Sequence, residues 1–208
     1  MWPEAAGRKV ILFFGRLNFK KGLDILTRAF GQLARKREDI VLVIAGPDTE
    51  GYGAKVRGWL EDEGVRNRTI FTGMLTGARK NAVLAGATVF VLPSYSENFG
   101  IAVVEAMAAG QPVVISRHVN ICREVADAEA GLVVDTDPDK VAQAMETLLD
   151  DPALAQRMGR NGKSLVRDRF TWNSAGPKLM ELYMRVVSQA RAAGVGTTAR
   201  AGAIGIGQ

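Results

Sequence analysis

Six short runs of apolar residues recur along the chain, and all but the fifth are followed after a loop by a segment with a helical pattern. The runs cover residues 9–14, 40–45, 70–72, 89–92, 113–115 and 131–134. Each run is apolar at successive positions, which is typical of strands buried on both faces. Helical spacing is clearest after the first run, where Leu23, Leu26, Phe30 and Leu33 recur at intervals of three and four. The alternation predicts an α/β fold with a doubly wound, Rossmann-like parallel sheet of six strands.

The pattern of the remaining segments predicts a single domain with a short extension at each terminus. Helices are expected to begin at Pro138 and Pro152, because each proline follows an aspartate that can cap the helix. Thr171 is expected to cap a last helix with a partly exposed apolar face. Pro177 should either kink this helix or move its start to a later residue. Residues 1–8 are interpreted as a linker, 9–191 as the domain, and 192–208, rich in Gly, Ala and Thr, as a flexible tail.

The composition favours a globular protein and argues against several kinds of binding site. The 208 residues are 47% hydrophobic, which is enough for a large core, and the net charge of +5 is dispersed. Because aromatic residues make up only 7%, a nucleic-acid surface is disfavoured. The single Cys122 and single His118 cannot form a disulfide or a Cys/His metal cluster, so we expect no metal and interpret His118 as a surface residue and Cys122 as buried or idle. Cysteine usage and the lack of a membrane-length apolar run favour a soluble, cytoplasmic protein.

Residues 89–116, VFVLPSYSENFGIAVVEAMAAGQPVVIS, predict a strand, a polar loop, a helix and the next strand. The loop should lie at the carboxyl edge of the sheet, where parallel sheets bind ligands. The N–H groups of Asn98, Phe99 and Gly100 are expected at the start of the helix, where they favour an anion. Glu97 and Glu105, with seven residues between them, bracket this point, and their carboxylates suit sugar or ribose hydroxyls.

A second candidate phosphate loop follows the first strand. Its sequence is GRLNFKKG over residues 15–22, which combines flanking glycines with Arg16 and Lys21. Arginine can bind a phosphate through two hydrogen bonds, and lysine adds a mobile point charge. The loops at Gly46 and at Gly73-Met74 follow the next two strands and should reach the same edge.

These motifs resemble the signatures of retaining glycosyltransferases of the GT-B fold, family 4, also called glycosyl transferases group 1. The match comprises P-S-x-x-E-x-F-G-x4-E over the central segment, in which seven residues separate the two glutamates, and G-R-L-x-x-x-K-G after the first strand. In that family both lie in the carboxyl-terminal, donor-binding domain. The resemblance implies that Glu97 contacts the donor sugar, Glu105 the ribose, and Arg16 and Lys21 the diphosphate. The catalytic residues would be Arg16, Lys21 and Glu97. Donor contacts would come from Gly15, Gly46, Gly73, Met74, Asn98, Phe99, Gly100 and Glu105.

The resemblance also implies an activity for the full enzyme. A hexosyl group would pass from a nucleotide-diphosphate sugar, such as a UDP-, GDP- or ADP-sugar, with retention at the anomeric carbon and without a cofactor or metal. The acceptor would bind an N-terminal domain that is absent here, so the isolated domain is expected to be inactive. The full enzyme is expected to bind no nucleic acid, and peripheral association with a membrane is compatible with the moderate positive charge.

Two departures from the family pattern bear on the site. Val119-Asn120 stands near a Gly-Gly pair of many members, so a donor contact from this loop is doubtful, although Glu124 fits the pattern. Thr88 replaces a common aspartate and is interpreted as structural. A non-catalytic module that binds a nucleotide or nucleotide sugar stays open as an alternative. A dinucleotide-dependent oxidoreductase is disfavoured because no G-x-G-x-x-G follows the first strand.

Overall fold

The computed structural model describes residues 2–192, and its contacts divide the chain into one unit up to Asp168 and a second from Arg169. The first unit contains a six-stranded sheet in the order β3-β2-β1-β4-β5-β6, and all of its strand pairs are parallel. The strands are β1 (Lys9–Phe14), β2 (Ile40–Ala45), β3 (Thr69–Gly73), β4 (Val89–Leu92), β5 (Val113–Ser116) and β6 (Gly131–Val134). The predicted Rossmann-like sheet is therefore confirmed.

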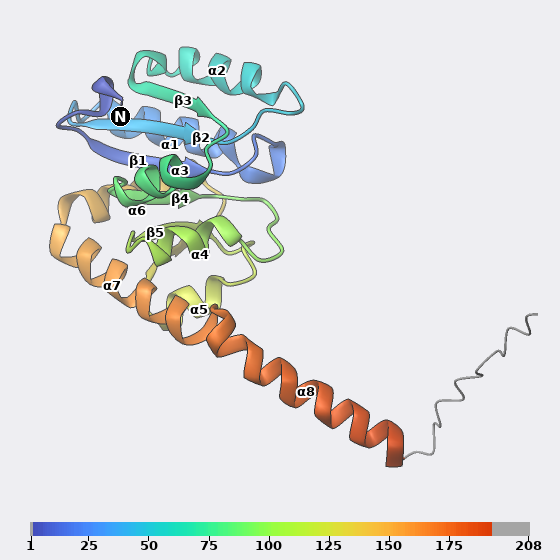
Figure 1. Cartoon of the computed structure of the whole chain (residues 1–208). Coiled ribbons are helices and arrows are strands. Elements are labelled where there is room, and N and C mark those ends of the chain that lie inside the picture. The colour runs from blue at the N-terminus through green and yellow to red at the C-terminus, as the bar shows by residue number, and fades with distance from the viewer. Residues whose placement is uncertain (1, 193–208) are drawn as a thin grey trace, which may run out of the picture. The chain divides into compact units, whose positions relative to one another are not determined.

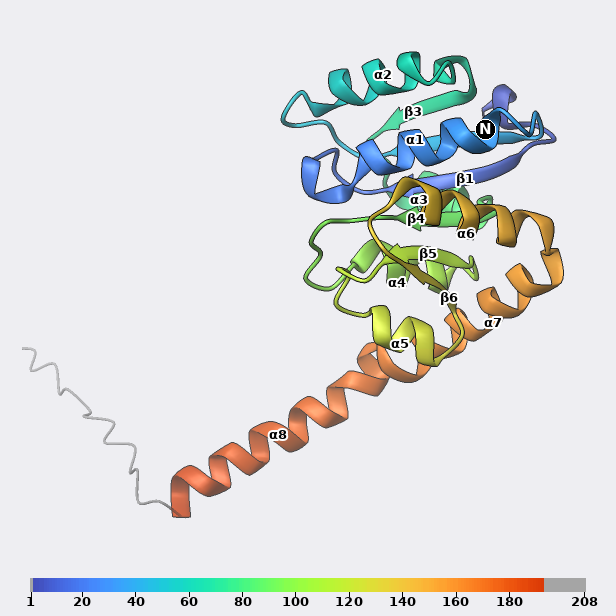
Figure 2. The same cartoon turned by 180° about the vertical axis from the view of Figure 1, so that it is seen from behind.

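Helices cover both faces of the sheet (Figures 1 and 2). Figure 2 shows α1 (Leu23–Ala34), α2 (Tyr52–Asp62) and α6 (Pro138–Asp150) on one side. Figure 1 shows α3 (Gly77–Ala85), α4 (Ile101–Ala108) and α5 (Cys122–Asp127) on the other. The remaining helical elements are η1 (Pro3–Ala5), η2 (Phe19–Lys21), η3 (Arg66–Arg68), α7 (Pro152–Arg169) and α8 (Trp172–Ala192).

The strands are apolar throughout because helices cover both of their faces. All six residues of β2 are buried, as are all four of β4 and of β5. The order of the sheet reverses between β1 and β4, which pair directly through Ile11 and Val89. The loops after β1 and β4 therefore emerge side by side at the carboxyl edge, which is the usual ligand position in such sheets.

The predicted element bounds agree to within about two residues, and the main omission is α5. We expected a loop between β5 and β6, but Cys122–Asp127 form a short helix in which only Val125 is buried. A single buried position leaves no helical spacing for sequence analysis to detect. Residues 3–5 of the predicted linker form η1. Thr88 has the structural role expected of it, since its Oγ1 accepts a hydrogen bond of 3.0 Å from the N–H of Val10.

Arg68 joins three segments at the end of the sheet opposite the loops after β1 and β4. Its guanidinium donates to the carbonyl oxygens of Ala34, Arg37 and Ile40 at 2.8, 2.6 and 3.1 Å. Burial lowers the pKa of Arg68, with a further contribution from the charge of Arg8. One arginine thus connects the end of α1, the loop after it and the start of β2.

The second unit contains α8. This helix begins at Trp172 and continues through Pro177, so its start is not delayed as the sequence had allowed. Leu179, Leu182 and Tyr183 are 43–60% exposed, in agreement with the expected partly exposed apolar face. Residues 193–208 of the predicted tail lie outside the described residues. Between residues 2 and 192, no helix combines the length and apolar character that crossing a bilayer requires.

Candidate functional site

The two predicted phosphate loops meet around one pocket at the carboxyl edge of the sheet. The pocket has a volume of about 220 Å³ and is lined mainly by polar and charged residues. The β1–α1 loop contributes one side and the β4–α4 loop the other. The lining residues are Arg16, Asn18, Lys20, Lys21, Ser96, Glu97 and Asn98. Four of them, Arg16, Lys21, Glu97 and Asn98, are sequence-predicted site residues.

The β1–α1 loop is held by its own cap and by the β4–α4 loop. Asn18 caps η2 by accepting a hydrogen bond from the Lys20 N–H at 3.0 Å. Gly22 adopts a left-handed conformation, with φ of 66°, and a Cβ placed there would lie only 2.1 Å from the carbonyl oxygen of Pro93. Only glycine permits both the conformation and this close approach. Asn18 and Lys20 were not predicted, although an asparagine two residues before a lysine in a glycine-flanked loop is a recognisable capping signal.

The predicted glycines of the first three strands lie next to one another. The Gly15 N–H donates to the Ala45 oxygen at 2.9 Å, and the Gly46 N–H donates to the Gly73 oxygen at 2.9 Å. A Cβ on Gly46, whose φ is 150°, would lie 1.9 Å from the Gly15 oxygen. Gly46 is therefore required by the packing of two strand ends, whatever it binds. Met74 follows directly and its side chain is 70% exposed.

Tyr95 connects the β4–α4 loop to the start of α1 through two hydrogen bonds. Its N–H donates to the Lys20 oxygen at 2.8 Å, and its hydroxyl donates to Asp24 Oδ2 at 2.7 Å. Burial, together with the hydrogen bond to Asp24, raises the pKa of Tyr95 to about 12. The hydroxyl therefore stays protonated and able to donate over the physiological range. These contacts make the two loops one structural unit.

The charges in the pocket are only partly paired. Lys21 and Glu97 form an ion pair, with side chains that are 21% and 18% exposed. We expected Lys21 to supply a mobile point charge, but the strand order brings Glu97 against its side chain. Arg16 is exposed and makes no ion pair within the described part of the chain. The pocket lining has three cations against one carboxylate, which favours an anionic ligand.

The amides at the start of α4 differ in part from those expected. Gly100 is the N-cap, with φ of 81°, and the helix begins at Ile101. The amides that open the helix therefore belong to Gly100, Ile101 and Ala102. Asn98 and Phe99, which were expected at the helix tip, lie just before it, and Asn98 lines the pocket instead. Phe99 is 44% exposed.

The loop after β5 supports Glu97 through its backbone. The Glu97 N–H donates to the His118 oxygen at 3.0 Å, and the Asn120 N–H donates to the Glu97 oxygen at 3.1 Å. Val119 between them is fully buried, and a Cβ on Gly100 would lie 3.0 Å from its Cγ1. His118 is exposed, as expected, and Cys122 is half-buried. Although the Gly-Gly pair is replaced, this loop positions a predicted site residue.

Glu105 lies outside the polar pocket. It borders a hollow of about 380 Å³ between α3 and α4, together with Lys80, Leu84 and Ala108. Lys80 Nζ donates to Glu105 Oε1 at 2.8 Å. The two predicted carboxylates are therefore each paired with a lysine, but in different surroundings. Lys80 was not singled out from the sequence, because a lone lysine in a helix carries no signal.

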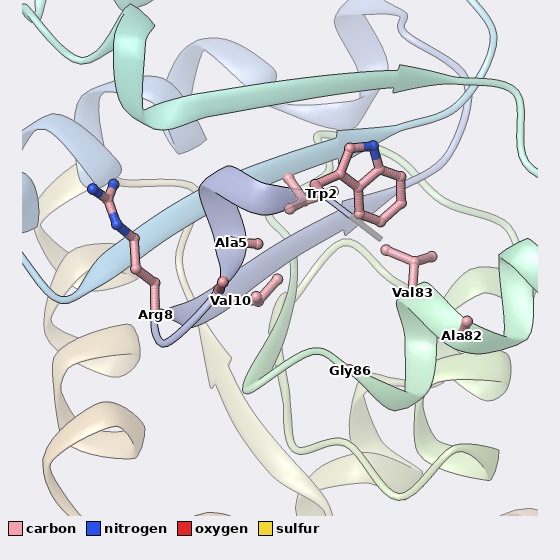
Figure 3. A pocket seen from close by; sticks show the side chains of 9 residues that line it. Trp2, Ala5, Arg8, Val10, Ala82, Val83 and Gly86 are labelled. Atoms are coloured by element: carbon pink, nitrogen blue, oxygen red, sulfur yellow. The ribbon is translucent and has the colours of Figure 1, made fainter.

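A further hollow lies between η1 and α3 (Figure 3). It measures about 260 Å³, and its lining is largely apolar, with Trp2, Val10 and Val83 among the residues. Figure 3 shows the Trp2 indole near Val83, whereas the guanidinium of Arg8 points away. This hollow lacks the convergent polar groups of the first pocket. Within residues 2–192, no group of three or more His, Cys, Asp or Glu side chains could hold a metal ion.

Known enzymes resemble this chain in sequence and in structure. The chain is 35% identical over 182 residues to the D-inositol 3-phosphate glycosyltransferase of Corynebacterium diphtheriae, a match that covers 84% of this chain and 42% of the relative. The sucrose-phosphate synthase of Thermosynechococcus elongatus superimposes with a TM-score of 0.78 at 29% identity, over 89% of this chain and 47% of that protein.

Anabaena Alr3699/HepE, solved in complex with UDP and glucose, superimposes with a TM-score of 0.78 at 22% identity, over 86% of this chain and 49% of that one. The chain thus spans less than half the length of each of these three proteins. Residues 2–165 match the family model described as glycosyl transferases group 1. With four fifths of its length in that match, the chain belongs to the group 1 glycosyl transferases.

Proposed function

We propose that this chain is the donor-binding half of a retaining glycosyltransferase of family 4, and that its polar pocket holds the diphosphate of a nucleotide-diphosphate sugar. The observation that carries the proposal is the convergence of Arg16, Lys20 and Lys21 around one pocket of about 220 Å³ beside the start of α4. Three cations and a helix N-terminus at the carboxyl edge of a parallel sheet favour a phosphorylated ligand.

In the proposed reaction, negative charge develops on the diphosphate as the bond to the sugar breaks. Arg16 is suited to a two-pronged hydrogen bond with one phosphate, and Lys21 to a point-charge contact with the same group. The amides at the start of α4 add a fixed positive end. Because these groups are held in place before the reaction, they can stabilise the leaving group without a metal ion. Glu97 is assigned to the sugar hydroxyls and Glu105 to the ribose.

Further donor contacts are proposed for the backbone around Gly15, Gly46 and Gly73-Met74, which the β1, β2 and β3 ends bring to the same edge. The acceptor would bind a separate N-terminal half, since the chain spans less than half of the length of its relatives. The isolated chain is accordingly expected to bind the donor without turnover. The full enzyme is proposed to work in the cytoplasm, with peripheral membrane contact through its positive charge.

Calorimetric titration of the chain with UDP, GDP and ADP in EDTA tests this proposal. UDP is the first choice, because one structural neighbour was solved with UDP and glucose. We expect one nucleotide to bind saturably, and Arg16→Ala and Lys21→Ala each to weaken binding by about tenfold or more. Arg16→Ala should leave Tm within a few degrees, because this side chain is exposed and unpaired.

Lys36→Ala is the matched control. It removes the same charge beyond the far end of α1, where Lys36 is exposed and 3.5 Å from Glu146. Failure of all three nucleotides to bind, or equal affinity in the Arg16 and control variants, would overturn the diphosphate assignment. Sugar transfer after addition of an acceptor-binding half would separate an enzyme from a non-catalytic nucleotide-sugar module.

A further inference from the structure

The pair formed by Lys80 and Glu105 stands apart from the polar pocket. Lys80 lies in the second turn of α3 and Glu105 in the second turn of α4, and Nζ donates to Oε1 at 2.8 Å. Their side chains are 30% and 31% exposed, so both heads remain accessible at the rim of the hollow between the helices. Leu84, Ala85 and Ala108 are among the apolar residues that form the rest of its lining.

The hydrogen bond leaves half of the Glu105 carboxylate available. A carboxylate has two acceptor oxygens, whereas an ammonium group is a donor only. Oε1 is bonded to Lys80, and Oε2 has no hydrogen-bond partner in the described part of the chain. A diol that approaches α4 can therefore donate to Oε2 while Lys80 keeps the other oxygen fixed.

The two lysine–carboxylate pairs should respond differently to a ligand. Lys21 lines the polar pocket beside Glu97, so a diphosphate would compete with Glu97 for it. Lys80 does not line that pocket; it comes from α3 and contacts Glu105 at the hollow between α3 and α4. A diphosphate in the pocket would leave the Lys80 pair intact. Lys80 would also offset the repulsion between the Glu105 carboxylate and the phosphates.

We propose that Lys80 is a positioning residue that orients Glu105 toward the vicinal diol of a ribonucleoside diphosphate and so makes the site selective for ribose over deoxyribose. The inference rests on the proposed function, which places the ribose at Glu105. Lys80 acts through Glu105 and does not touch the nucleotide itself.

The test compares a ribonucleoside diphosphate with its 2′,3′-dideoxy analogue, using the base that binds best. The wild-type chain should prefer the ribonucleotide by about tenfold, the usual worth of a hydrogen bond to a charged group. Lys80→Met should weaken ribonucleotide binding by about threefold and leave the affinity for the dideoxy analogue unchanged. Lys80→Arg, which keeps a donor cation, should restore most of the preference. In a Glu105→Gln background, Lys80→Met should have little further effect.

Arg79→Met is the matched control, because Arg79 is the neighbouring exposed cation on α3 and has no ion-pair partner among the described residues. It should leave the preference for ribose intact, and far-UV circular dichroism and Tm of every variant verify that it folds. A ribose preference that Lys80→Met leaves unchanged would overturn the inference while the proposed function stands. Equal losses for both ligands would also overturn it, since they would indicate direct phosphate contact.

Failure of the proposed function gives other results in the same titrations. If the wild-type chain bound no nucleoside diphosphate, the donor-binding proposal and the inference would both be wrong. If it bound both ligands equally, the diphosphate pocket would stand, but the assignment of ribose to Glu105, and with it the role of Lys80, would be refuted.

Discussion

Replacing Glu97 by glutamine should strengthen the binding of a nucleoside diphosphate and weaken the additional contribution of the sugar. The two effects have opposite signs because Glu97 has two roles in the proposed site. It pairs with Lys21, which the diphosphate needs, and it is assigned to the sugar hydroxyls. Glutamine keeps the size and an acceptor oxygen but removes the charge that competes with the phosphates.

The expected gain follows from the ion pair. Two unit charges about 4 Å apart interact by about 4 kcal/mol at an effective dielectric constant of roughly 20, which is an upper limit before desolvation is counted. Exposed pairs measured by double-mutant cycles contribute about 0.2–1 kcal/mol. With side chains only 21% and 18% exposed, this pair should lie near the top of that range or above it. A release of about 1 kcal/mol raises the nucleotide affinity about fivefold.

Calorimetry with the nucleoside diphosphate and with its sugar conjugate measures both effects. Glu97→Gln should bind the nucleotide about fivefold more tightly, and the advantage of the conjugate over the nucleotide should shrink. The gain should also decrease with added salt, since screening weakens the competing pair. Glu50→Gln is the control for a general loss of negative charge, because Glu50 accepts a hydrogen bond from the pocket residue Asn18 at 2.6 Å. Unchanged or weaker nucleotide binding by Glu97→Gln would refute the reasoning.

Three further predictions concern the scaffold of the site. Gly22→Ala should destabilise the fold by about 2–3 kcal/mol in urea titrations, because φ is 66° and the new Cβ would lie 2.1 Å from the Pro93 oxygen; a change below 0.5 kcal/mol would contradict it. Arg68→Lys should cost about 2 kcal/mol by the same measurement, since one ammonium group cannot serve all three carbonyls that the guanidinium reaches. The pKa of Tyr95 is about 12, above the usual 10, so the folded state holds this proton more tightly. The Tyr95 hydroxyl therefore stabilises the folded state below pH 10, and this contribution is lost as the pH rises toward 12. Tyr95→Phe, which cannot donate to Asp24, should remove this part of the pH dependence of the free energy of unfolding.

The fold could be predicted from the sequence, which also supplied the candidate site residues. Continuous apolar runs such as residues 40–45 can be buried only between two layers of helices, and six of them in alternation with helical patterns require a parallel sheet. The family signatures then named Arg16, Lys21, Glu97 and Glu105. These conclusions depend on local patterns of a few residues, which the chain carries before it folds.

The contacts between these residues were decided by the tertiary structure. Lys21 meets Glu97, 76 positions away, only because β1 and β4 are neighbours at the point where the strand order reverses. Glu105 and Lys80 are paired by the packing of α4 against α3, which also separates Glu105 from the polar pocket. The backbone of Glu97 is held by the loop after β5, a loop from which the sequence had made a direct donor contact doubtful. Such pairings follow from strand order and helix packing, and no local pattern of apolar and polar residues records them.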